Sequence, residues 1–214
     1  MKKKYEFTGK TKEHYGVTLE QIRRISNGEI GGWIEKESNL SYQHDCWVYR
    51  NAMVYGNAQV FGNAKVYENA IVYGNAKVYG NAMIYGNAMV CGNATVSGNA
   101  QVFGNAHVFG RAYVFGNAYV SERALVCGNA KVYGEDRVTG AITDLMNLCE
   151  FHVTASITDQ YIRIGCQSKS FSEWRAYVKS KSTEHLKDCG DEESHKHCVR
   201  LIKFILKKEN AWKS

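Results

Sequence analysis

Two stretches of the sequence contain residue types that could do chemistry. The segment NAHVFG at 105–110 holds His107, and the segment CGDEESHKHC at 189–198 holds two cysteines, three acids and two histidines. A histidine can act as general base in acyl transfer, and histidines together with thiolates are the common ligands of zinc. Whether either stretch is a site depends on the spacing of its partners and on the elements that position them.

The 189–198 segment does not have the spacing of a zinc site. On a helix, His195 and His197 are two residues apart and face different sides. The acids before them are typical of the solvated first turn of a helix, where the dipole favours negative charge. We therefore expect no metal, and a helix over roughly 192–209. Its buried side would carry Cys198, Leu201, Ile202 and Ile205.

His107 lies inside a repeat. From Val48 to Arg137 the chain runs through fifteen uninterrupted hexads, and a sixteenth, ending at Thr143, is degenerate. Each reads aliphatic, aromatic or small, Gly, Asn, Ala and a variable residue. Ala–x–Val alternates as a short strand does, and Gly–Asn suits a corner because both residues tolerate positive φ. Three strands and three corners close a coil of 18 residues, and stacked coils form an all-β prism with strands about 4.8 Å apart.

The 18-residue coil shows which outward residues share a face of the prism. One face is apolar along its length apart from one histidine and the tyrosine hydroxyls. Such a face on a rigid prism indicates an interface, so we expect self-association through it. Its two columns are Met53, Ile71, Met89, His107 and Leu125, and Tyr55, Tyr73, Cys91, Phe109 and Cys127.

The other two faces mix lysines and glutamine with aromatic rings. Outward tyrosines beside lysines can stack on nucleic-acid bases, but the formal charge of +6 is spread along the chain and forms no basic arm. We expect the rings to form stacked ladders instead, and nucleic acid to be an unlikely partner. No apolar run approaches a membrane span and the N-terminus does not resemble a secretion signal. Seven unevenly spaced cysteines favour a reducing, cytoplasmic setting.

The hexads resemble those of hexapeptide-repeat proteins, which fold as a left-handed parallel β-helix. The stretches GVTLEQIRRI, GGWIEKESNLS and CWVYRNAMVYGNA at 16–25, 31–41 and 46–58 resemble uncharacterised members from enterobacteria and their phages or prophages, often labelled acyltransferases. The resemblance covers about two thirds of the chain. The fifteen hexads and the degenerate sixteenth give five to six coils. The resemblance implies that these coils are left-handed, that the prisms pack as a homotrimer, and that acyl-CoA is the substrate if the protein is an enzyme.

The catalytic role that this resemblance implies for His107 is weakened by two departures. NAHV resembles the NAHI stretch of the lipid A pathway acyltransferases, whose catalytic histidine comes three residues later, where this chain has Gly110. The hexads also lack the protruding loop that shapes an acceptor pocket, and no carboxylate is placed to orient His107. We therefore interpret His107 as an interface or ligand-contacting residue, with the catalytic base as the alternative.

The repeat is expected to lie between two different ends, which gives segments 1–47, 48–143 and 144–214. In the first, KYEFTG predicts a strand and TLEQIRRI a short helix, and residues 34–47 predict an imperfect first coil. This segment would cap the exposed strand edge. The last segment predicts a small α+β domain, either a second cap or a ligand-binding module.

Within that α+β domain, HVTASITDQYIRIGCQ at 152–167 alternates like one or two strands, and SFSEW at 170–174 fits a capping box. Phe171, Trp174 and Val178 would share one helical face. A candidate site for a small anionic, nucleotide-like ligand lies at this strand–helix junction, with a solvated surface and a core tryptophan as the alternative. Its residues are Arg163, Lys169, Trp174 and Arg175.

These features favour a non-enzymatic oligomeric scaffold, of phage or prophage type, that binds a host protein or sequesters a small ligand. The alternative is an acyl-CoA-dependent acyltransferase with His107 as its base.

Overall fold

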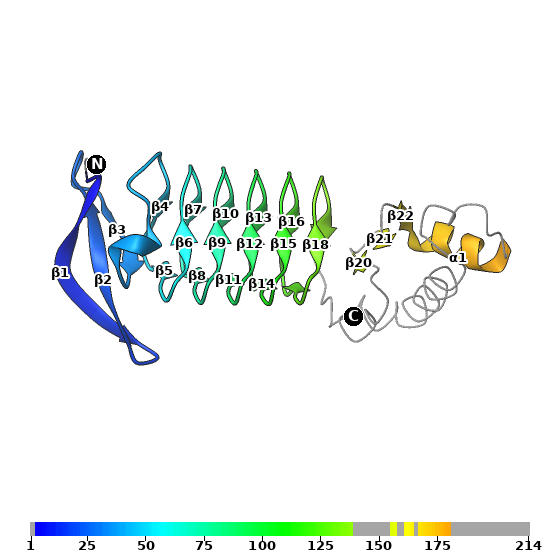
Figure 1. Cartoon of the computed structure of the whole chain (residues 1–214), viewed down its shortest axis with the longest axis horizontal. Coiled ribbons are helices and arrows are strands. Elements are labelled where there is room, and N and C mark those ends of the chain that lie inside the picture. The colour runs from blue at the N-terminus through cyan, green and yellow to red at the C-terminus, as the bar shows by residue number, and fades with distance from the viewer. Residues whose placement is uncertain (1–2, 139–154, 158–160, 165–166, 181–214) are drawn as a thin grey trace.

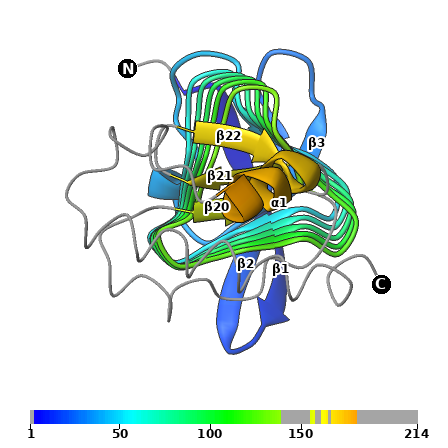
Figure 2. The same ribbon diagram turned by 90° about the vertical axis from the view of Figure 1, so that its right-hand side faces the viewer.

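The computed structural model describes residues 3–138, 155–157, 161–164 and 167–180. In it the chain winds as a parallel β-solenoid of about six turns, as predicted. The coils follow one another along a straight axis, with a β-hairpin at the N-terminal end (Figure 1). Viewed down that axis they superimpose as a three-sided outline (Figure 2). The predicted prism is confirmed.

Each side of the prism is one parallel sheet, built from two-residue strands in 18-residue register, such as Met89 with His107. Sheet 1 contains β5 (Met53–Val54), β8 (Ile71–Val72), β11 (Met89–Val90), β14 (His107–Val108) and β17 (Leu125–Val126). Sheet 2 contains β6 (Gln59–Val60), β9 (Lys77–Val78), β12 (Thr95–Val96), β15 (Tyr113–Val114) and β18 (Lys131–Val132). Sheet 3 contains β4 (Trp47–Val48), β7 (Lys65–Val66), β10 (Met83–Ile84), β13 (Gln101–Val102), β16 (Tyr119–Val120) and β19 (Arg137–Val138).

The interior of the prism is filled by the aliphatic and alanine positions of the hexads. From Val48 to Val126 every such residue is fully buried, whereas the residue between them points outward. Small and branched side chains therefore alternate inside every coil, and each coil repeats the packing of the one before it. The predicted inward, outward, inward alternation is confirmed.

Most corners are formed by Gly–Asn pairs, as predicted, and Arg50, Glu68 and Glu122 take the place of glycine at three others. Gly98 has a φ of 68°, and the glycines at equivalent corners have similar values. The asparagines do more than turn the chain, because wherever the residue one coil further on is also asparagine, as at Asn63 and Asn81, the side chains form a hydrogen bond. Asn63 Nδ2 donates to Asn81 Oδ1 at 3.2 Å, and Asn81 Nδ2 donates to Asn99 Oδ1 at 3.0 Å. These ladders connect the coils along the edges of the prism.

The N-terminal cap contains a hairpin of β1 (Tyr5–His14) and β2 (Val17–Arg24). The strand predicted for KYEFTG is confirmed, but the helix predicted for TLEQIRRI is wrong, because that segment is β2. Leu19 and Ile22, whose three-residue spacing also suits a helix, are both fully buried. A break in the pairing of β2 with β3 (Ile30–Ile34), next to Ile22, shifts the regular alternation.

The predicted imperfect first coil is confirmed. Trp33 of β3 pairs with Met53, Leu40 forms a bridge with Val60, and β4 pairs with β7. A short 3-10 helix, η1 (Glu37–Asn39), joins the first two of these contacts. The hairpin pairs with β3 and so covers the strand edge of sheet 1, and it projects beyond the outline of the prism (Figure 2).

Beyond the last coil lies an antiparallel sheet of β20 (Ala155–Ile157), β21 (Tyr161–Ile164) and β22 (Gln167–Ser170), followed by α1 (Phe171–Ser180). The capping box is confirmed, because Glu173 accepts from the backbone N–H of Ser170 at 2.7 Å and donates its own N–H to Ser170 Oγ at 3.3 Å. The helix predicted over 192–209, with His195 and His197, lies outside the described residues. The boundaries at 47/48 and 143/144 remain predictions.

Candidate interaction face

Sheet 1 presents the predicted apolar face. The outward side chains of β8, β11, β14 and β17 are half-buried within the single chain, and Phe109, which follows β14, is 37% exposed. Strand pairing places His107 between Met89 and Leu125. The two predicted columns are therefore continuous along this side of the prism.

The N-terminal end of this face is covered by the hairpin, which the sequence did not predict. Trp33 continues the column before Met53, and the Lys12 ammonium lies over its ring, 4.6 Å from the centroid. His14 packs edge-on against Tyr55 with ring centroids 5.6 Å apart. Met53 is only 8% exposed as a result. The place of Trp33 in this column could have been predicted from the GGWIE segment, because Trp33 precedes Ile34 just as Met53 precedes Val54.

Sheet 1 also carries a stacked pair of tyrosines. The rings of Tyr55 and Tyr73 have centroids 5.2 Å apart and planes inclined by 9°. The pKa of Tyr73 is raised to about 12, first by a hydrogen bond with the Cys91 side chain and then by burial. Burial also raises the pKa of Tyr55. Both phenols therefore stay neutral at physiological pH and contribute ring surface to the face.

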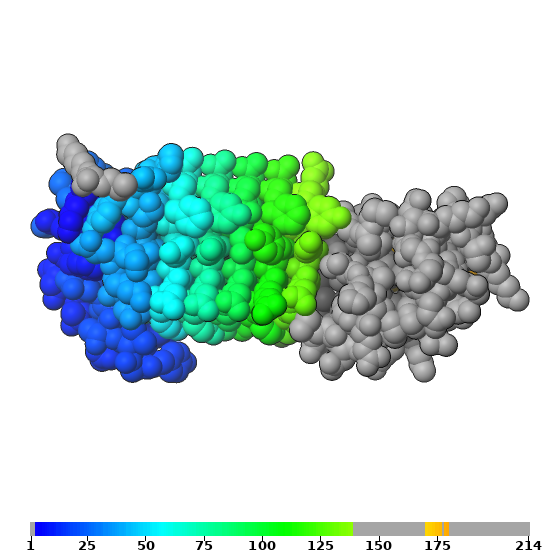
Figure 3. Space-filling view, in the orientation of Figure 1, coloured from blue at the N-terminus to red at the C-terminus, as the bar shows by residue number. Residues whose placement is uncertain are grey.

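His107 is half-buried in the middle of this face. Its neighbours Ala106 and Val108 are fully buried, so the imidazole points outward. Among the described residues, no carboxylate forms a hydrogen bond or ion pair with His107. The coils from β5 to β19 follow one another without an inserted loop, and the face turned toward the viewer in Figure 3 is an unbroken prism surface. Both interpretations of His107, as an interface or ligand-contacting residue and as a catalytic base, remain predictions.

The two other faces carry the charged and polar residues. Gln59, Lys77 and Lys131 are exposed on sheet 2, and Arg137 is exposed on sheet 3. Their aromatic side chains form the predicted ladders, with Phe61 stacked on Tyr79 at 4.8 Å between centroids, for example. Rings that stack along the prism axis bury their faces against one another, which favours the ladder interpretation over base stacking.

The candidate ligand residues of the C-terminal domain are only partly described. Trp174 is fully buried and Arg175 is exposed. Backbone pairing places Arg163 opposite Ser168 and Lys169 opposite Ile162. A fully buried ring cannot stack on a ligand, so Trp174 here has the position of a core residue. The four-residue ligand site remains a prediction.

Part of the repeat matches a protein-family model, described as YdcK Beta solenoid repeat. The match covers residues 58–74, 76–91, 82–98 and 88–104, together less than a quarter of the chain. It supports a repeat β-solenoid protein, in agreement with the coils described above. No curated protein matches the chain.

Clusters of metal-ligating residues and membrane-spanning helices are both absent from the described part of the chain. No group of three or more histidine, cysteine or acidic residues there could hold a metal ion. No helix there is long and apolar enough to cross a membrane.

Proposed function

We propose that this protein is a non-enzymatic scaffold whose prisms self-associate through sheet 1 and present the remaining surface to a partner. The observation that carries the proposal is the contrast between faces. Sheet 1 offers half-buried apolar side chains from Ile71 to Leu125, whereas sheets 2 and 3 carry lysine, arginine and glutamine. A flat apolar face flanked by polar ones is favourable to bury against a copy of itself. The resemblance to hexapeptide-repeat proteins supports three prisms around a threefold axis.

The test exploits two equivalent methionines on different faces. Met89 on sheet 1 and Met83 on sheet 3 both precede an inward aliphatic residue, and both are half-buried. The substitution Met89→Asp should convert the assembly to monomers, because a carboxylate would be buried at the interface. Met83→Asp should leave the assembly intact.

Native mass spectrometry reads out the oligomeric state, and circular dichroism shows that both variants keep the β-solenoid. A monomeric parent protein, or loss of assembly in both variants, would refute an interface on sheet 1. The same spectra report any carried ligand as extra mass. A nucleotide-sized adduct would support sequestration of a small anionic ligand, and a bare trimer would favour a protein partner.

An acyl-CoA-dependent acyltransferase is the alternative function, and one observation favours it. His107 lies on the face where a neighbouring prism would form a cleft, and hexapeptide acyltransferases place a histidine base in such a cleft. Acetyl-CoA bound only to the folded state must raise the melting temperature. A rise in the parent protein, together with acyl transfer that His107→Ala abolishes, would replace the scaffold proposal with the enzyme.

A further inference from the structure

The first coil contains a corner that differs from all later ones. Leu40 pairs with Val60, twenty residues further on, whereas Trp47 pairs with Lys65, eighteen residues further on. The segment between Leu40 and Trp47 therefore holds two residues more than the corresponding later segment. It bends at His44, which has a φ of 58°.

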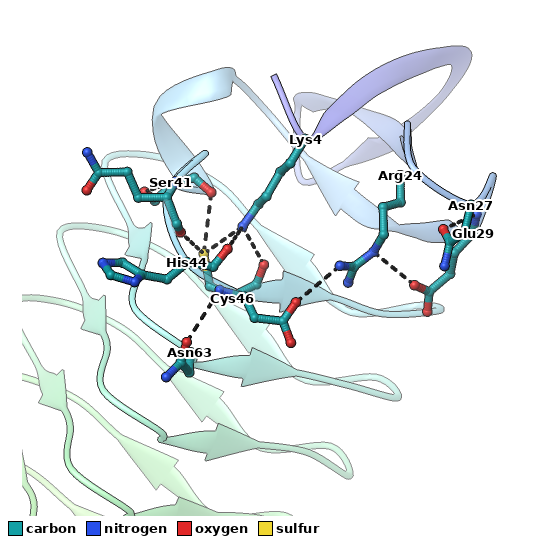
Figure 4. Close-up of polar contacts among 10 residues, drawn as sticks. Lys4, Arg24, Asn27, Glu29, Ser41, His44, Cys46 and Asn63 are labelled. Carbon is teal, nitrogen blue, oxygen red and sulfur yellow. Dashed lines mark hydrogen bonds and ion pairs between the residues drawn. The ribbon is translucent and has the colours of Figure 1, made fainter. Parts of the chain in front are cut away.

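This longer corner surrounds the amine of Lys4. Lys4 Nζ donates to the carbonyl oxygens of Cys46 at 2.7 Å and of His44 at 3.3 Å, and it contacts Cys46 Sγ at 3.1 Å. The Cys46 sulfur also lies 3.4 Å from the carbonyl oxygen of Ser41. Figure 4 shows Lys4 reaching down into the corner, with its nitrogen beside the sulfur. The loop holds a nitrogen nucleophile and a sulfur in fixed contact.

We infer that Lys4 and Cys46 form an oxidation-dependent covalent crosslink, a sulfenamide between Nζ and Sγ. Reacting atoms about 3–3.5 Å apart are in a near-attack arrangement, and the Nζ–Sγ distance of 3.1 Å meets that condition without movement of the chain. Sulfenic cysteine condenses with a backbone nitrogen to form a sulfenamide, and the Lys4 amine offers a nitrogen for the same reaction. The inference stands independently of the proposed scaffold function.

The reaction has two balanced steps, with hydrogen peroxide as the oxidant. The thiol sulfur first attacks one peroxide oxygen; the O–O bond breaks, Cys46 becomes a sulfenic acid, and the other oxygen leaves as water. The unprotonated Lys4 amine then attacks the sulfenic sulfur. The S–N bond forms, the S–O bond breaks, and the departing hydroxide takes a proton from the nitrogen and leaves as water. Sulfur is oxidised by two electrons, and hydrogen peroxide accepts them, one at each of its two oxygens, which both end as water.

The surroundings favour this product over a disulfide. Cys46 is fully buried, whereas Lys4 is half-buried and His44 is exposed, so peroxide reaches the sulfur only when this corner opens. The other cysteines of the described part are Cys91 and Cys127. The nearer, Cys91, comes two and a half coils after Cys46, about 12 Å along the prism axis at the strand spacing, which is beyond disulfide reach. The amine is the nucleophile in contact.

Peptide mapping of the full-length protein tests the inference. After peroxide treatment and tryptic digestion without reductant, residues 4–10 should be joined to residues 37–50, with a mass equal to the two peptides less two hydrogens. A thiol reductant should separate the pair and restore both peptides. Because the crosslink ties β1 to the first coil, the oxidised protein should melt at a higher temperature, and reductant should abolish the shift.

Three variants supply controls. Lys4→Arg keeps the positive charge and the donors but removes the reactive amine, and Cys46→Ser removes the sulfur, so both should lose the joined peptide. Cys91→Ser should keep it. Recovery of Cys46 as a free thiol or sulfinic acid with an unmodified Lys4 would overturn the inference. A joined peptide that retains an oxygen atom would overturn the direct S–N bond.

Discussion

The N-terminal hairpin extends one of the three sheets of the regular coils, but hairpin and coils are stabilised in different ways. In the coils every 18 residues bring the same contacts, so the core and the asparagine ladders repeat and no single residue is decisive. The hairpin relies on contacts made once. The Tyr5 hydroxyl lies 3.1 Å from the carbonyl oxygen of Leu40, and the Arg24 guanidinium lies 4.3 Å from the centre of the Trp47 ring. A solenoid therefore needs specialised residues where its repetition stops.

The largest effect is expected at Trp47, where the hairpin meets the coils. This ring is fully buried, so Trp47→Ala should lower the free energy of unfolding by about 3–5 kcal/mol. Its Nε1 has no hydrogen-bond partner among the described residues, so Trp47→Phe loses packing alone and should cost clearly less. Urea denaturation followed by circular dichroism measures both. Equal costs would show that the indole nitrogen has a role that the geometry does not reveal.

The next effect concerns the corner glycines of the coils. Gly98 has a φ of 68°, and a Cβ there would lie 2.9 Å from both the backbone N and the O of Gly116. Gly98→Ala should therefore cost about 2 kcal/mol, from the left-handed conformation and the close approach together.

Glu122 provides the matched control for this corner substitution. It already adopts a φ of 57° with a side chain in place, so Glu122→Gly relieves that conformational cost and should be neutral or stabilising by up to about 1 kcal/mol. Thermal melts of the two variants measure the difference. A harmless Gly98→Ala would show that the coils move apart easily at their corners.

A third, smaller effect tests the asparagine ladders. Asn81 both accepts and donates a side-chain hydrogen bond along its edge, so Asn81→Ala should cost about 1 kcal/mol. On another edge the ladder runs from Asn75 to Asn93 and then meets Arg111, one coil further on. Arg111→Asn would extend that ladder and should raise the melting temperature. If neither variant changes stability, the corner backbone alone holds the coils together.

The contrast between coils and cap also explains how much could be predicted from sequence. In the coils the same hexad pattern forms the same strand and corner fifteen times. The strand positions, the corners and the apolar face can therefore be predicted from the hexads. In the cap, TLEQIRRI has helical spacing but becomes β2 because β1 and β3 flank it and the pairing with β3 is interrupted beside Ile22. Neither the hairpin's cover over Trp33 nor the contact of Lys4 with Cys46 could be predicted, since each joins residues without a shared period.

The smallest effect compares two tyrosines, one from each region. Burial raises the pKa of Tyr5 in the cap, whereas the pKa of Tyr73 on sheet 1 is raised to about 12 chiefly by its hydrogen bond with Cys91. An ordinary tyrosine has a pKa of about 10. Because folding favours the neutral phenol of Tyr73, its stabilising contribution is complete below pH about 10 and is lost as the pH rises towards 12.

Cys91→Ala should therefore lower the pKa of Tyr73 and leave that of Tyr5 unchanged. Phenolate absorbance recorded against pH should show one tyrosine titrating earlier in this variant than in the parent protein, and Tyr73→Phe should remove that same transition. The loss of stability at alkaline pH would then have two separate causes. One is the hydrogen bond between Tyr73 and Cys91 on sheet 1, and the other is the burial of Tyr5 in the cap. An unchanged titration in Cys91→Ala would mean that burial governs both tyrosines, and the two regions would hold their phenols neutral by the same means.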